Sequence, residues 1–341
     1  MPGWGYFGKM EPQNLISVEI GWLARFNLPM NIDTSSRTVR VARSPAAAVS
    51  SPPQSAGVGP SPPPRYYTPP PQPMAAYERK RSNRTPEESF STNVALHNIV
   101  TVTSGHGGVG LSVMASMLAL TLTERGQSCV LVDADFVAGC LDLLLGLERE
   151  PGLRFSQIDA PLGRIEGAAL RHELIDWEGI RVLPCDPWST RQPEWWEVQA
   201  VIRALAETHD IVIVDAGQGG LIETVSDLRH GVQVMAAELS VIGLARAKAH
   251  RLRLSAWECG IPHIVGIEPR GTPRGRGSVD VAEAEDYLSA AVVGPIRLTS
   301  SLCGDVLEGL GIRSVPKGSR KATEALADAV ERDIRAGARA A

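Results

Sequence analysis

Short runs of apolar residues alternate with longer amphipathic stretches along the chain from about Val94 onward. The runs are rich in β-branched residues, as at 99–103 and 211–214, and such runs are typical of buried strands. The stretches between them place apolar residues at helical spacing. Near-continuous apolar strands separated by helices predict an α/β fold, in which a mostly parallel sheet is covered by helices on both faces.

The expected elements follow from this alternation. Strands are predicted over 99–103, 129–135, 180–183, 211–215, 232–236, 263–268 and 292–298. Helices are predicted over 112–122, 194–207, 221–228, 240–259, 281–288 and 302–310, and from about Lys321 onward, and residues 141–147 form an apolar segment.

Composition divides the chain into three parts, 1–43, 44–93 and 94–336. The middle part is rich in Pro and Ser and contains Pro62-Pro-Pro-Arg-Tyr-Tyr-Thr-Pro-Pro-Pro71. We expect it to be a disordered linker or a polyproline II ligand for an aromatic groove, because it has little apolar surface to offset ordering entropy. The first part is either a short docking segment or sequence upstream of a true start at Met30 or Met74. The last part is long enough for one α/β core.

Charge and cysteine usage exclude several classes of protein. The net charge of −4 provides no global basic field to recruit nucleic acid or an anionic membrane, so no specific nucleic-acid partner is expected. The five cysteines are scattered without metal-ligand spacing, which favours reduced residues that pack as small hydrophobes. No run of 18 apolar residues occurs, so we expect no transmembrane segment and a cytoplasmic protein.

A glycine-rich turn lies between the first predicted strand and the first predicted helix. In this geometry backbone N–H groups and a helix N-terminus face an anion, as in loops that bind ATP phosphates. Such a loop normally carries Lys directly before Ser112, where this chain has Leu111. The alternative is a tight turn in which Ser112 caps the helix. The residues assigned to phosphate binding are Gly107, Gly108, Val109, Gly110, Leu111 and Ser112.

Acidic residues end two of the predicted strands. Asp133 and Asp135 follow one apolar run, and Asp215 ends another, at the sheet edge where ligands bind in this architecture. We expect Ser112, Asp133 and Asp215 to hold Mg²⁺, with Asp135 as the candidate catalytic residue. Helix capping is the alternative for all three carboxylates.

The missing lysine weakens the predicted site. One charge-assisted hydrogen bond contributes about 1.5–3 kcal/mol, so weak or absent ATP hydrolysis is expected. A Gly- and Pro-rich loop after Glu268 carries Arg270, Arg274 and Arg276. Arg274 and Arg276 are candidates to bind phosphate in place of the lysine, and a solvated basic loop is the alternative.

These motifs resemble those of the MinD and ParA ATPases, which carry a deviant Walker A loop. The family pattern K-G-G-x-G-K-[ST] corresponds to His106–Ser112, so both family lysines are replaced. Val132-Asp-Ala-Asp135 is similar to the second acidic motif and Ile213-Val-Asp215 to the Walker B strand. The segments 136–146, 266–271 and 293–297 resemble the branch of CpaE and TadZ pilus-localisation proteins and the actinobacterial septum-site-determining proteins.

The resemblance implies a P-loop NTPase fold and an ATP- and Mg²⁺-dependent homodimer. Proteins of this family act as positional switches at the cell pole, the septum or the inner face of the membrane. The carboxylate at the Asp135 position helps to polarise the attacking water, and the lysine at the His106 position reaches across the dimer. This chain keeps the carboxylates, and it has Ala216-Gly-Gln-Gly-Gly220 where the family commonly has a Pro-containing switch.

The leading hypothesis is a positioning protein that binds division, pilus or secretion machinery through its surface and its Pro-rich segment. One alternative is an active Mg-ATPase of the same family that uses Arg274 or Arg276 in place of the lysine. A second alternative is an accessory protein of type VII secretion. DNA segregation ranks last, because no recognition module accompanies the ATPase-like part.

Overall fold

The computed structural model describes residues 97–160, 163–186, 188–189, 191–271 and 277–340. The predicted segments 1–43 and 44–93 lie outside these residues, as do Arg274 and Arg276.

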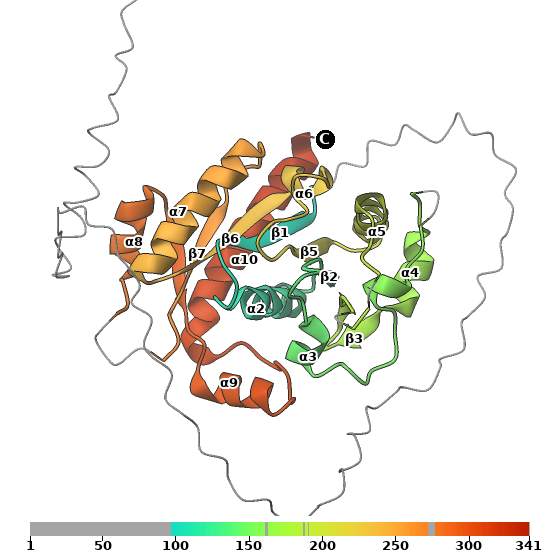
Figure 1. The fold of residues 1–341 in the computed structure, drawn as a ribbon, viewed down its shortest axis with the longest axis horizontal. Helices are drawn as coiled ribbons and strands as arrows, with labels where there is room; N and C mark the ends of the chain where they lie inside the picture. Colours follow the sequence, from blue (N-terminus) through green and yellow to red (C-terminus); the bar gives the residue numbers. More distant parts are fainter. Residues whose placement is uncertain (1–96, 161–162, 187, 190, 272–276, 341) are drawn as a thin grey trace, which may run out of the picture. The chain divides into compact units, whose positions relative to one another are not determined.

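A sheet of eight strands forms the centre of the described part, in the order β3-β4-β2-β5-β1-β6-β7-β8 (Figure 1). The edge strand β3 runs antiparallel to β4, and every other neighbouring pair is parallel. The strands are β1 (Ile99–Ser104), β2 (Cys129–Asp133), β3 (Ile175–Trp177), β4 (Ile180–Leu183), β5 (Ile211–Asp215), β6 (Val232–Glu238), β7 (His263–Ile267) and β8 (Val292–Ile296).

Helices follow most of the strands in the chain. They are α2 (Leu111–Glu124), α3 (Leu141–Leu145), α4 (Gly167–Glu173), α5 (Trp195–Ala206), α6 (Asp227–His230), α7 (Val241–Ala256), α8 (Val281–Leu288), α9 (Ser300–Leu307) and α10 (Lys317–Ala340), with a 3₁₀ turn η2 at Phe155–Gln157. None of these helices is long and apolar enough to cross a membrane.

Alternate residues of the central strands point to opposite faces and feed two separate cores. In β5, Ile213 joins the core under α2 and α10, while Val212 and Val214 join the core under α5, α7 and α8. Both faces of the central strands are therefore buried, which explains their continuous apolar sequence. The predicted mostly parallel sheet with helices on both faces is confirmed.

Some predicted bounds were wrong. The strand predicted over 129–135 ends at Asp133, because the chain turns there and the Gly139 amide donates to the Asp135 carbonyl. The helix predicted over 221–228 is a series of turns followed by the single-turn helix α6. The C-terminal helix begins at Lys317 instead of Lys321, directly after Pro316, whose fixed φ suits a helix start. The short elements β3 and α4 were not predicted.

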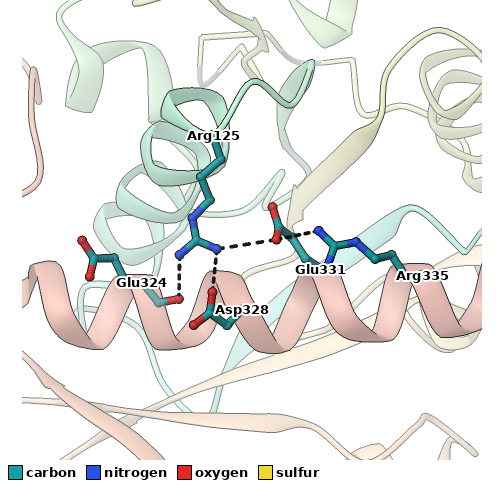
Figure 2. Close-up of polar contacts among 5 residues, drawn as sticks. All are labelled: Arg125, Glu324, Asp328, Glu331 and Arg335. Atoms are coloured by element: carbon teal, nitrogen blue, oxygen red, sulfur yellow. Dashed lines mark hydrogen bonds and ion pairs between the residues drawn. The ribbon is translucent and has the colours of Figure 1, made fainter.

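The C-terminal helix α10 is anchored to α2 by one arginine (Figure 2). Arg125, at the C-terminal end of α2, donates to the Asp328 carboxylate at 2.8 Å and to the Glu324 carbonyl at 3.2 Å. Its Nη1 also lies 3.6 Å from Glu331, which pairs with Arg335 at 3.0 Å. The buried apolar side of α10 contributes most of the stabilisation of this contact, and the hydrogen bonds and ion pairs of Arg125 orient α10 against α2.

Arg125→Ala is expected to lower the free energy of unfolding by about 1 kcal/mol, because it removes a partly buried charge pair and a charge-assisted hydrogen bond. Chemical denaturation followed by circular dichroism measures this change. Arg335→Ala, which removes an exposed partner of the same Glu331, is the matched control and should cost less than about 0.5 kcal/mol. Equal losses in the two variants would show that Arg125 does not anchor the helix.

Candidate functional site

The glycine-rich loop connects the carboxyl end of the central strand β1 to the start of α2 (Figure 1). Gly110 caps α2 with φ 97°, a left-handed conformation that favours glycine. Gly107 and Gly108 are exposed, and a side chain at either position would meet no atom within 4 Å. The loop therefore has open space at Gly107 and Gly108, close to the N-terminus of α2, where an anion would be favoured.

The residue that replaces the lysine does not face this space. Leu111 is 7% exposed and belongs to the apolar core beneath α2. A described cation that does reach the loop is Arg270, whose Nη2 donates to the Gly108 carbonyl at 3.5 Å. Arg270 is exposed and comes from the segment after β7.

Two carboxylates lie side by side at the same edge. Asp133 ends β2 and Asp215 ends β5, and the two residues are paired in register across these neighbouring parallel strands. Both are 2% exposed. Burial and the neighbouring Asp215 carboxylate raise the pKa of Asp133 from 3.8 to about 7. Burial likewise raises the pKa of Asp215 from 3.8 to about 6.

Hydrogen bonds hold both carboxylates in place. Asp133 accepts from the Leu141 amide at 3.1 Å and from the Asp135 amide at 3.2 Å. Asp215 accepts from the Gly217 amide at 3.1 Å, and the Ser112 hydroxyl also bonds it and opposes the rise in its pKa. The structure thus brings Ser112, Asp133 and Asp215 together, as the metal prediction requires, and it also gives Asp133 a capping role at α3.

Asp135 caps the turn that follows β2. Its Oδ1 accepts from the Val137 amide at 3.2 Å and from the Ala138 amide at 3.0 Å. Its Oδ2 lies against Gly217, where φ is 55° and any side chain would collide with the carboxylate. The segment 216–220 after β5 is therefore in contact with the candidate catalytic residue, and the catalytic role of Asp135 stays a prediction.

The donors at this edge fit a hard divalent cation. Mg²⁺ prefers carboxylate and hydroxyl oxygens and keeps several of its own waters. The buried acidic pair with raised pKa values provides negative charge that a divalent cation would compensate. Among the described residues no three His, Cys, Asp or Glu side chains are arranged to hold a metal, so Ser112 and water would complete the ligand set.

Three contacts of the site were missed by sequence reasoning. The Cys185 thiol, just beyond β4, hydrogen-bonds Asp133, and nothing in the sequence links these two residues. Arg270 contacts the loop, whereas the prediction named Arg274 and Arg276 of the same basic segment, which lie outside the described residues. Gly217 leaves room for Asp135, and its place in the glycine-rich stretch 216–220 was the available signal.

Comparisons with known proteins agree with this geometry. The family model ParA, described as NUBPL iron-transfer P-loop NTPase, matches residues 95–164. The septum site-determining protein MinD of Thermotoga maritima is 29% identical over 127 residues, which cover 36% of this chain and 45% of that protein. An uncharacterized protein of Mycobacterium tuberculosis is 34% identical over 130 residues, covering 38% and 32%. The chain thus spans less than half the length of these two relatives.

Solved structures with the same fold include three from this group. A ParA family ATPase from Chlorobium tepidum has a TM-score of 0.56 at 20% identity, covering 67% of this chain and 97% of that chain. A chain of the MinC:MinD cell division protein complex of Aquifex aeolicus has a TM-score of 0.52 at 19% identity, covering 69% and 95%. MinD from Pyrococcus horikoshii, complexed with Mg-ADP, has a TM-score of 0.51 at 20% identity, covering 69% and 96%.

The fold is that of the P-loop NTPases. The family model over residues 95–164 and the MinD relatives support the likeness to the MinD/ParA family. The resemblance inferred from the motifs is confirmed at this level, and the narrower likeness to CpaE and TadZ stays a prediction.

The free energy of unfolding of the Asp133→Asn variant is expected to rise relative to that of the unchanged protein as pH rises from about 4 to about 7. The native carboxyl keeps its proton to higher pH than the unfolded chain does, so its ionisation costs stability across this window. The gain should reach at least 1 kcal/mol by about pH 8, since one pKa unit corresponds to about 1.4 kcal/mol.

Urea denaturation at a series of pH values measures the difference between the two proteins. The two proteins must be compared because other groups also titrate. Burial lowers the pKa of His250 to about 4, so this residue makes the fold more stable as pH rises, which opposes the effect of Asp133. Leu252→Ala, at an exposed position of α7, removes no ionisable group, so it is the control and should give a flat difference. A flat difference for Asp133→Asn as well would contradict the raised pKa.

Proposed function

We propose that this protein is a spatial-positioning protein of the MinD type, which acts by binding partners and has a weakened nucleotide site. Its relatives support the family-level role, because several of them are septum site-determining proteins. Since the chain spans only part of those relatives, its partners and its activity belong to the proposal. We place its action in the cytoplasm, at the septum, the cell pole or the inner face of the membrane.

The observation that carries the proposal is the position of Leu111. The loop keeps the open backbone amides that an anion needs, while the side chain in the lysine position is buried in the core. Binding of phosphate by backbone amides survives such a change better than the stabilisation of charge during phosphoryl transfer. A loop of this kind therefore supports a nucleotide-responsive or structural site more than an efficient hydrolase.

The residues present would still have roles toward nucleotide and Mg²⁺. The amides of 107–112 would hold phosphate oxygens, and Ser112, Asp133 and Asp215 would hold Mg²⁺ directly or through water. Bound Mg²⁺ would neutralise phosphate charge. Asp135 lies beside the 216–220 segment, so it is placed to transmit a change at the acidic pair to that loop.

Partner binding follows the example of the relatives. The Aquifex protein of this fold was solved as a MinC:MinD complex, and we propose a corresponding homodimer and a machinery partner for this chain. The Pyrococcus protein complexed with Mg-ADP supports ADP or ATP with Mg²⁺ as the ligand class.

Leu111→Lys is expected to strengthen binding of Mg-ATP at least tenfold, because it restores one charge-assisted hydrogen bond of about 1.5–3 kcal/mol. Isothermal titration calorimetry on the full chain measures the dissociation constant, with light scattering to report dimerisation. Leu111→Met, which keeps the volume and adds no charge, is the control and should bind as the unchanged protein does. Micromolar binding and turnover by the unchanged protein would refute the weakened site.

A second candidate function is an active Mg-ATPase in which an arginine replaces the lysine. The contact between Arg270 and the Gly108 carbonyl favours this alternative, because it puts a guanidinium at the rim of the loop. Under our main proposal, Arg270→Ala changes Mg-ATP affinity less than about threefold, since an exposed cation contributes little. A loss of tenfold or more in affinity, together with loss of measurable hydrolysis, would instead support the arginine-assisted ATPase.

A further inference from the structure

Three tryptophans are exposed in one short segment between β4 and the first turn of α5. Trp188 is 83% exposed, Trp195 47% and Trp196 42%. The Trp195 and Trp196 rings meet edge to face, with centroids 5.7 Å apart. Indole rings are usually largely buried, so the exposure of the contacting pair Trp195 and Trp196, with Trp188 exposed in the same segment, indicates a binding surface. We call Trp188, Trp195 and Trp196 the tryptophan surface.

The fold holds this segment without using the indoles as core. Arg191 donates to the Ile158 carbonyl at 3.2 Å and pairs with the Glu197 carboxylate at 2.5 Å. Glu197 in turn accepts from the Glu194 amide at 2.9 Å, so the start of α5 is capped. The helix itself is packed by Val198, Ile202 and neighbouring apolar residues. The exposed rings are therefore presented on a fixed support, and the hydrophobic core does not require them.

The polar groups around the rings are acidic. Glu194 is exposed and directly precedes Trp195. Asp186 lies two residues before Trp188, and its carboxylate accepts a hydrogen bond from the Trp188 amide at 3.1 Å. The positive charge of Arg191 is matched by Glu197. The exposed indole rings, with the exposed Glu194 carboxylate beside them, suit a ligand that has apolar rings and a basic side chain. An anionic lipid surface would be repelled by the same carboxylates.

We propose that the tryptophan surface binds a proline-rich segment in the polyproline II conformation that carries a basic residue. Proline rings pack on exposed indole faces in this mode of recognition, and the pre-set backbone lowers the entropy lost on binding. The chain's own sequence at 60–73 has this chemistry, with two triplets of proline around Arg65, Tyr66 and Tyr67. A basic residue in such a ligand would pair with the exposed Glu194 carboxylate. The surface is independent of nucleotide, so the proposal goes beyond the function above.

The test uses a labelled peptide of residues 60–73 and fluorescence anisotropy, without nucleotide. The receptor is the full chain with Pro62, Pro63, Pro64, Pro69, Pro70 and Pro71 replaced by Ala, so that its own segment does not compete. We expect saturable binding that weakens at least tenfold in Trp195→Ala and Trp196→Ala, the size of effect of truncating an aromatic hot spot. Replacing the same prolines in the peptide should abolish binding, and Arg65→Ala in the peptide should weaken it severalfold.

Controls separate recognition from folding. Leu252→Ala, at a position of α7 that is 66% exposed, should bind the peptide as the receptor does. Trp196→Phe keeps an aromatic ring and should retain most of the affinity, and circular dichroism should show unchanged folding in every variant. Equal binding by the tryptophan variants, or no binding by the receptor, would overturn the proposal. Binding to phosphatidylglycerol vesicles without binding to the peptide would also overturn it, in favour of a lipid surface.

Discussion

The parallel pairing of β2, β5 and β1 is the constraint on which the rest of the site depends. In-register pairing of these three strands brings their carboxyl ends to one edge of the sheet. Each residue of β5 is more than 80 positions away in the chain from its partner in β1 or β2. Both faces of the strands are buried, so a shift in register would displace apolar side chains from two cores at once. The pairing of the strands therefore fixes the position of the glycine loop relative to the aspartates, and contacts within the loop are not needed for this.

This placement has an electrostatic cost. Two carboxylates lie side by side in a buried position, and their raised pKa values express the penalty of ionising both without a compensating cation. A P-loop protein with a lysine before Ser112 would have a positive charge close by, whereas here the position belongs to the apolar core. A divalent cation held at this edge would compensate the charge of the buried acids. Proteins keep such strained arrangements mainly at ligand sites.

Stability and recognition are assigned to different parts of the chain. The apolar side of α10 and the Arg125 anchor close one face of the sheet, and they leave the carboxyl edge free. The β4–α5 segment is held by Arg191 and Glu197, so its tryptophans can remain exposed. The surfaces used by our two proposals are therefore not the ones on which the stability of the fold depends.

The sequence by itself determined the fold class, the order of most elements and the strand ends that carry Asp133 and Asp215. These features depend on local periodicity and on buried strands that leave a continuous apolar signal. Short elements such as β3 and α4 could not be predicted from the sequence, because their few residues are stabilised by neighbours that are distant in the chain. Only the tertiary structure decided that Leu111 is buried, that Cys185 bonds Asp133, that Arg270 contacts the loop, and that the tryptophans are exposed. Each of these depends on which segments meet in space, and side-chain pattern along one segment carries no information about that meeting.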